Sequence, residues 1–155
     1  MAETTAAIRT TLSRTIRRRL MAVWLDGDGA LLTPIQFPAV PGLVADVTGA
    51  LVPRAPSGLP WLKLDLRWVE SSEFTISQPA LNKNVGIIQL AIFVPAGLGT
   101  AMIETLVGQA RTVFNKFYGE GGLICKASSP GPDLKAGAWM ASTVVTEFYC
   151  HEQTA

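Results

Sequence analysis

The stretch WLKLDLRWV, residues 61–69, carries the clearest structural signal in this chain of 155 residues. Apolar side chains stand at every second position between three charged ones, Lys63, Asp65 and Arg67. Because successive side chains of a β-strand point to opposite faces of a sheet, this alternation predicts a strand with one buried face. The charged face is expected to be solvated or to contact a neighbouring protein.

A second strand is predicted at VGIIQLAIFV, residues 85–94, which is apolar on both faces apart from Gln89. A strand of this kind is typical of a central position in the sheet, covered on both sides. The intervening residues 70–84, ESSEFTISQPALNKN, are polar and show no steady period. We therefore expect a long hairpin with residues 70–84 as its flexible tip.

Two helices are expected on either side of this hairpin in the sequence. In residues 4–21 an apolar residue recurs at every fourth position from Ile8 onward, which gives one apolar stripe. The second helix is predicted to begin at Thr100, a suitable N-cap residue, and to reach Tyr118, with Gly119 as the residue that stops it.

The remaining segments are shorter. Residues 25–42 are dense in glycine and proline and predict a loop, and residues 43–60 add a short apolar piece and a second linker. Two further strands, 121–128 and 138–150, are expected to form a final hairpin around the loop 128–137.

The order of these elements predicts one domain over residues 1–155 with an α+β fold: a mainly antiparallel sheet built from hairpins and packed against two helices. Charged residues make up 16% of the chain and hydrophobic residues 48%, whereas a typical domain has about 25% charged residues. This composition fits a surface that is partly covered by partners, or a merely apolar domain. No apolar run approaches the roughly 20 residues that cross a bilayer, so no membrane partner is expected.

The two cysteines are expected to lie apart. A hairpin that turns near Pro132 would place Cys125 opposite about Ser142, and Cys150 would follow about eight residues farther along the ladder. At the rise of a strand this is about 25 Å, too far for a disulfide.

Two motifs resemble ligand-binding loops without completing them. DGDG, residues 26–29, has the start of a calcium loop, but Leu31 and Phe37 occupy the positions where an EF-hand requires glycine and glutamate. The stretch IFVPAGLGTAMIETL, residues 92–106, leads from a strand through glycines into a helix, as phosphate loops do. It lacks the lysine of a Walker loop, and Met102 replaces the third glycine of a dinucleotide fingerprint. Structural turns are the favoured interpretation of both.

No catalytic constellation is found in the sequence. The only histidine is His151, and the 12 carboxylates show no close pairing that indicates an acid–base couple. A zinc site would need three or four ligands. We therefore expect no enzyme activity, no cofactor and no metal.

Basic residues concentrate at the start of the chain, where five of the 13 lie within the first 20 positions: Arg9, Arg14, Arg17, Arg18 and Arg19. Most of them fall away from the apolar stripe of the first helix. They indicate either a solvated face that suits the negative end of the helix dipole, or a contact with an acidic partner. A nucleic-acid-contacting adaptor is the alternative function, although the net charge is only +1 and interleaved aromatic residues are missing.

From Trp61 onward the sequence resembles the small tail-terminator, or tail-completion, proteins of long-tailed bacteriophages. The resemblance lies in PWLKLDLRWVES, then VGIIQLAIFVPAGLGTAMIETLVGQARTVF, then a short strand and AWMASTVVTEFY. Phe93, Pro95, Gly97 and Gly99 match a family motif in which a strand leads directly into a helix, and Trp139 matches the aromatic residue that often opens the last strand.

The resemblance implies a virion structural protein of the tail at the head–tail junction, made in the host cytoplasm. Such a subunit forms a homo-hexameric ring on the tail tube, ends tube polymerisation and forms the interface to the head connector. Its implied partners are further copies of itself, the tail tube protein and the head–tail connector or stopper protein, with DNA only as cargo in the channel. A ring contact is heterologous and needs two different faces, which fits the low charge content.

Loops carry contacts while a sheet holds position, so the tip 70–84 and the loop 128–137 are docking candidates beside the arginine face. The candidate partner-interface residues are Arg14, Arg17, Arg18, Arg19, Glu73, Phe74, Lys83, Asp133 and Lys135.

Overall fold

The computed structural model describes most of the chain, in the ranges 5–37, 43–45, 51–53, 60–73, 81–95, 97, 100–131, 134–136 and 139–153. Its helices are α1 (Thr5–Val23) and α2 (Thr100–Phe114), and a short 3-10 turn, η2, covers Glu120–Gly122. Its strands are β1 (Ile35–Gln36), β2 (Leu43–Ala45), β3 (Leu51–Pro53), β4 (Trp61–Glu73), β5 (Leu81–Pro95), β6 (Ile124–Pro130), β7 (Leu134–Ala136) and β8 (Trp139–Gln153).

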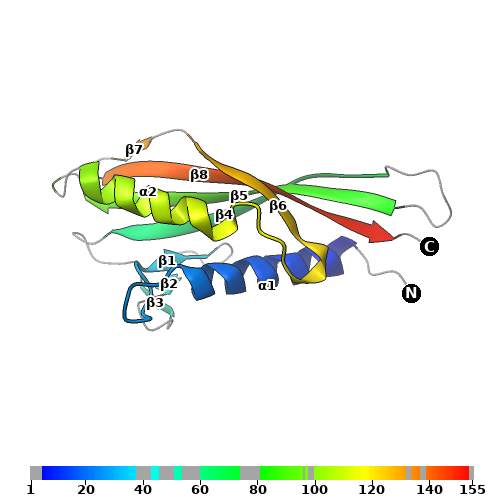
Figure 1. The fold of residues 1–155 in the computed structure, drawn as a ribbon, viewed down its shortest axis with the longest axis horizontal. Coiled ribbons are helices and arrows are strands. Elements are labelled where there is room, and N and C mark those ends of the chain that lie inside the picture. The colour runs from blue at the N-terminus through cyan, green and yellow to red at the C-terminus, as the bar shows by residue number, and fades with distance from the viewer. Residues whose placement is uncertain are drawn as a thin grey trace.

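The strands form one sheet in the order β3-β2-β1-β4-β5-β8-β6, and β7 pairs with β8 as well. Every pairing is antiparallel except that between β1 and β4. The long strands β4, β5 and β8 run along the long axis of the molecule, with α1 on one side of them (Figure 1). The predicted α+β fold, with a mainly antiparallel sheet and two helices, is confirmed.

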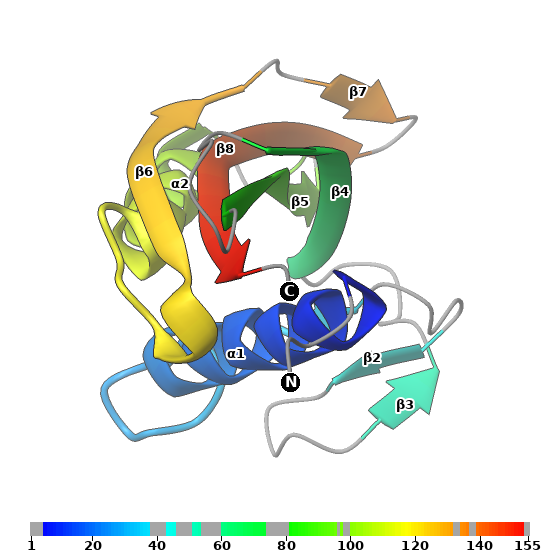
Figure 2. The ribbon, with the colours of Figure 1, turned by 90° about the vertical axis from the view of Figure 1, so that its right-hand side faces the viewer.

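The sheet buries one face against both helices. Even-numbered residues of the long strands, such as Leu64, Ile88 and Val144, lie in a single hydrophobic core together with residues of α1 and α2. The view along the long axis shows the strands curling over α1 (Figure 2). The helical stripes contribute Leu12, Ile16 and Leu20 from α1 and Ile103, Leu106, Ala110, Val113 and Phe114 from α2.

The prediction that residues 85–94 are covered on both sides is confirmed for one face and only in part for the second, which we call the outer face. There Ala91 is buried, whereas Val85, Ile87, Gln89 and Phe93 are half-buried. The strand is central in the sheet, as predicted, but the helices cover only its core face.

The hairpin between β4 and β5 is longer than predicted, so residues 70–84 are not all a tip. The ladder continues through Glu70↔Val85 to Glu73↔Asn82, after a register shift between Trp68 and Glu70. Residues 70–73 are all polar, so they show no apolar period although their backbones are paired. The remaining tip, 74–80, lies outside the described residues.

The second helix ends at Phe114 and not at Tyr118, and Gly119 is not its stop signal. Lys116 takes a left-handed conformation with φ of 53°, and its N–H donates to Lys126 O at 3.1 Å. Phe117 O accepts the N–H of Cys125 at 2.8 Å. Residues 115–119 therefore leave the helix because they hydrogen-bond along the outer edge of β6.

The predicted register of the final hairpin is also wrong. Residues 134–136, expected in a loop, form β7 and pair with 139–141, and Pro130 pairs with Val144, which excludes the register of a hairpin that turns near Pro132. This shift places Cys125 opposite Phe148, only two residues from Cys150. The separation between Cys125 and Cys150 along the strand direction is therefore about 7 Å and not the predicted value of about 25 Å. Both thiols are buried and neither forms a disulfide, and Cys150 Sγ donates to Gly121 O at 3.3 Å.

The segment before the long hairpin holds more structure than the predicted loops. Within 25–42, the two residues of β1 pair in parallel with β4, and within 43–60 the strands β2 and β3 pair with each other. Strands of two or three residues are too short for a periodic signal. The DGDG stretch forms the predicted turn: Asp26 Oδ1 accepts the N–H groups of Asp28 and Ala30 at 2.8 and 3.1 Å.

Candidate partner interfaces

Arg19, predicted to meet a partner, connects the two helices instead. Its Nε donates to Val113 O at 2.8 Å, and its guanidinium stacks 4.2 Å from the centroid of the Phe117 ring. Val113 lies in the last turn of α2, where carbonyl groups have no partner within the helix. Arg19 therefore stabilises the end of α2 and fixes α1 beside it.

Two other arginines of α1 also pack against aromatic rings. The guanidinium of Arg9 lies 5.0 Å from the Trp68 ring, and that of Arg17 lies 5.6 Å from the Phe37 ring. Both side chains are half-buried. Arg17, predicted as an interface residue, thus has an internal contact as well as a place at the surface.

The two remaining candidates on α1 face solvent. Arg14 is exposed, and Arg18 makes a 3.9 Å contact with Glu120 in which both side chains are more than two-thirds exposed. An ion pair so exposed contributes little to stability. These two residues therefore remain accessible to a partner.

A groove of about 370 Å³ runs along this side of α1 and is lined by Arg9, Thr10, Ser13, Arg14 and Arg17. We call it the arginine groove. The ring contacts of Arg9 and Arg17 orient two guanidinium groups at positions eight residues apart, which is about 12 Å along a helix. Guanidinium groups held by stacking suit carboxylate or phosphate recognition.

None of the other predicted interface residues is among those that line this groove. Glu73 and Lys83 are in the paired ends of β4 and β5, opposite Asn82 and Ser72, and Lys135 in β7 is opposite Met140. The structure thus places their backbones in the sheet and not in loops, while their side chains are not described. Phe74 and Asp133 lie outside the described residues.

The outer face of the sheet was not among the predicted interface residues. It carries a cavity of about 400 Å³ lined by Asp65, Leu66, Arg67, Ile87, Gln89 and Val145. Ile87 and Val145 are half-buried apolar side chains between charged and polar ones. The alternation in residues 61–69 already indicated that this face is either solvated or in contact with a neighbour.

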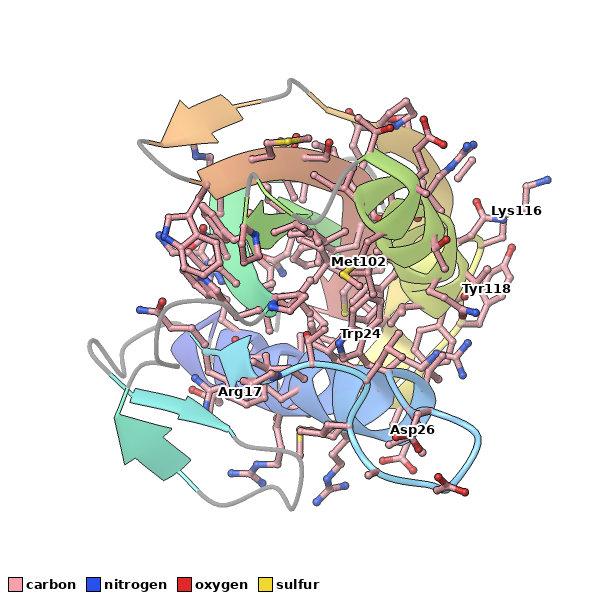
Figure 3. All side chains as sticks on the ribbon, turned by 90° about the vertical axis from the view of Figure 1, so that its left-hand side faces the viewer. Arg17, Trp24, Asp26, Met102, Lys116 and Tyr118 are labelled. Atoms are coloured by element: carbon pink, nitrogen blue, oxygen red, sulfur yellow. The ribbon has the colours of Figure 1, made fainter. Side chains whose placement is uncertain are left out.

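A second apolar feature lies between α2 and the segment that precedes β1. This cavity of about 520 Å³ is lined by Leu32, Thr33, Pro34, Pro60, Met102, Thr105 and Leu106, and we call it the Met102 pocket. Met102 is 40% exposed and lies above Trp24 in Figure 3. Sequence reasoning missed it because its two walls are about 70 residues apart in the chain.

Burial dominates the chemistry of Cys125. Removal from water raises the pKa of its thiol from 9.0 to about 12, and the Arg19 guanidinium lowers that pKa by a smaller amount. The thiol is therefore neutral and unreactive at neutral pH. Within the described part of the chain, no three His, Cys, Asp or Glu side chains lie close enough together to hold a metal ion.

Strand β5 ends at Pro95 and α2 begins at Thr100, so residues 92–106 form the predicted strand-to-helix connection. Within the described ranges, neither helix combines the length and the apolar character that a membrane crossing requires.

Comparisons with known proteins show that the fold recurs elsewhere. No protein-family model matches the chain, and no curated protein matches it. One solved structure, of a protein whose name states no activity, matches with a TM-score of 0.60 at 12% sequence identity. The match covers 95% of this chain and 96% of the other. At this identity the likeness shows the fold alone.

Proposed function

We propose that this chain is a tail-terminator-like virion subunit that forms a ring on the end of a tail tube. The ring stops tube polymerisation and offers its other side to a head connector or stopper protein. The subunit acts by binding and shape, with no catalytic step, and DNA passes through the ring as cargo.

The observation that carries this proposal is that the helices cover one face of the sheet, while part of the outer face stays open. Both helices pack on the core face, while the outer face keeps Ile87 and Val145 half-buried beside Asp65 and Arg67. A mixture of apolar and charged side chains around a hollow is typical of a non-obligate protein interface. The Met102 pocket adds a second, separate apolar surface, and a ring subunit needs two different surfaces.

The resemblance to tail terminators from Trp61 onward supports the same proposal. The family motif implies a strand that leads directly into a helix, and β5 and α2 have that arrangement. The arginine groove is available for acidic side chains of the tube or connector protein.

The test is deletion of the gene in the host that produces the particles, followed by electron microscopy of the products. We expect tails of uncontrolled length that do not join heads, restored by expression of the full chain. Tails of uniform length that still join heads would contradict the proposal.

The arginine groove also favours a second candidate, a nucleic-acid-contacting adaptor, because guanidinium groups bind phosphates as well as carboxylates. Binding of this kind releases counterions and weakens steeply with salt. Fluorescence anisotropy with labelled duplex DNA at 50 and 200 mM salt distinguishes the two functions. A tail terminator is expected to show no useful affinity at either concentration, whereas an adaptor would lose about tenfold or more between them.

A further inference from the structure

We propose that Tyr118 of one copy inserts into the Met102 pocket of a second copy, in a head-to-tail contact that repeats from copy to copy. The contact between Tyr118 and the pocket does not depend on the proposed function. The inference that repeated contacts close into a ring does rest on that function.

Tyr118 is a fixed aromatic projection. It is 72% exposed, against 40% for Met102 and 38% for Leu25, the other large exposed apolar residues described. Its neighbours hold its backbone in place: Cys125 N–H donates to Phe117 O at 2.8 Å, and Gly119 N–H donates to Leu123 O at 2.9 Å. Because this segment is already ordered, little further conformational entropy is lost when Tyr118 is buried by a partner.

The Met102 pocket has the size and lining to receive such a side chain. Its volume of about 520 Å³ lies within the range of small-ligand sites, about 300–1,000 Å³. The described residues of its walls are apolar except for two threonines. A buried tyrosine needs a hydrogen-bond partner for its hydroxyl.

Thr105 can supply that partner. Its hydroxyl donates to Ala101 O at 2.9 Å, which leaves its oxygen able to accept a proton from Tyr118. The other hydroxyl in the pocket, on Thr33, already accepts the Trp24 Nε1–H at 2.9 Å and donates to Pro34 O at 3.2 Å. Thr105 is therefore the expected acceptor.

The projection and the pocket cannot meet within one molecule. Met102 lies in the first turn of α2 and Tyr118 follows its last turn, so the 15-residue helix separates them by about 22 Å. Figure 3 places Met102 above Trp24 near the middle of this view, whereas Tyr118 projects at the side of the molecule. A contact between different patches on identical chains is heterologous and propagates into a ring or a filament.

The occupant we assign to the pocket is therefore a second copy of this chain. Tyrosine is enriched among the few residues that dominate interface energies. A stable interface buries roughly 1,200–2,000 Å² of accessible surface, and one tyrosine side chain supplies only a small part of that area. The surfaces around Tyr118 and around the pocket must therefore also be in contact.

The test uses two variants of the full chain, each of which removes one side of the contact. Tyr118→Ala removes the projection and keeps the pocket, while Met102→Glu blocks the pocket and keeps the projection. Both residues are exposed, so both variants should fold, which circular dichroism and thermal melting check. Leu25→Ala, at another exposed apolar residue, is the matched control.

Native mass spectrometry and sedimentation velocity of concentrated protein measure the assemblies. We expect the unaltered chain and Leu25→Ala to form assemblies larger than dimers, and each single variant to remain monomeric. An equimolar mixture of the two variants should form a 1:1 heterodimer and nothing larger, because only one complete contact can form. Monomers throughout, or full assembly by Tyr118→Ala, would overturn the proposal.

A photo-crosslinking p-benzoylphenylalanine at position 118 locates the contact directly, in solution and in assembled particles. The expected crosslink joins two copies through the tryptic peptide that ends at Arg111, the one that follows Arg19 or the one that contains Pro60, because all three carry residues of the Met102 pocket. A crosslink to another protein, or to another part of this chain, would contradict the assignment. If the crosslink is found but deletion of the gene leaves tails normal, the contact between copies is supported and the proposed function is wrong. If tails require the chain but Tyr118→Ala still assembles, the proposed function is supported and the contact through Tyr118 is wrong.

Discussion

At the scale of single residues, Gly86 explains how two large aromatic rings pack on the core face. Trp68 and Phe148 lie on the strands to either side and meet edge to face, with ring centroids 5.0 Å apart. A Cβ at Gly86 would lie 2.7 Å from Phe148 Cε1 and 2.9 Å from Arg67 O. A glycine inside a strand often marks such a close approach.

Gly86→Ala is therefore expected to destabilise the fold by about 1–3 kcal/mol, the usual cost of overpacking. Gly108 is the matched control, because nothing lies within 4 Å of a Cβ added there, on the exposed side of α2. Gly108→Ala should stabilise the fold by about 0.5–1 kcal/mol through helix propensity. Urea denaturation followed by circular dichroism measures both, and equal effects of the two changes would contradict this account.

The buried thiol of Cys125 predicts a dependence of stability on pH. Its pKa is about 12 in the folded chain and 9.0 when unperturbed, so the unfolded state loses the proton first as the pH rises. The stabilising contribution is complete below pH 9 and is lost as the pH rises toward 12. We expect Cys125→Ser to reduce the fall in melting temperature between pH 8 and pH 10.5, and an unchanged fall would exclude this cause.

At the scale of secondary structure elements, the end of α2 is set by its neighbours. Asn115 Oδ1 accepts the Ser128 N–H at 2.9 Å, and Lys116 N–H donates to Lys126 O at 3.1 Å. These bonds satisfy backbone groups of β6 that an edge strand would otherwise leave open to another chain. Five residues that could have continued the helix therefore cover the edge of the sheet.

Arg19 connects α1 to the same region, and its replacement tests that role. Arg19→Ala removes the hydrogen bond to Val113 O and the stacking on Phe117, and we expect a loss of about 1–3 kcal/mol in the free energy of unfolding. Arg19→Lys should recover little of it, because an ammonium group lacks the planar guanidinium. Arg14→Ala, at an exposed position, should change stability by less than about 0.5 kcal/mol. Equal losses at both arginines in chemical denaturation would contradict this role.

At the scale of the whole molecule, helices that cover only one face of a sheet leave part of the other face exposed. Val145 lies on that outer face opposite Gln89 and Ser129, so a lysine there meets no like charge directly across the ladder. Val145→Lys is expected to change the free energy of unfolding by less than about 1 kcal/mol and to prevent assembly. Thermal melting measures the first effect and native mass spectrometry the second.

Gln109→Lys, on the exposed side of α2, is the control for that change, because it adds the same charge away from the sheet. We expect it to fold and assemble like the unaltered chain. Normal assembly by Val145→Lys would show that the outer face is not an interface.

The sequence by itself determined the elements whose side chains repeat with a period. The alternation from Leu62 to Trp68 and the helical stripes of α1 and α2 appear in the core as predicted, because periodicity reflects burial on one face. The α+β class follows from the order of those elements.

Only the tertiary structure decided where strands pair and where helices stop. The bulge after Trp68, the strand β7 and the turn of residues 115–119 all depend on hydrogen bonds to segments distant in sequence, which leave no local pattern. The surface features also depend on contacts between distant segments. Arg17 packs against Phe37 and Arg19 against Phe117. The Met102 pocket forms only where two segments distant in the sequence meet. Local periodicity encodes what each element buries, but long-range packing alone fixes what the molecule leaves exposed.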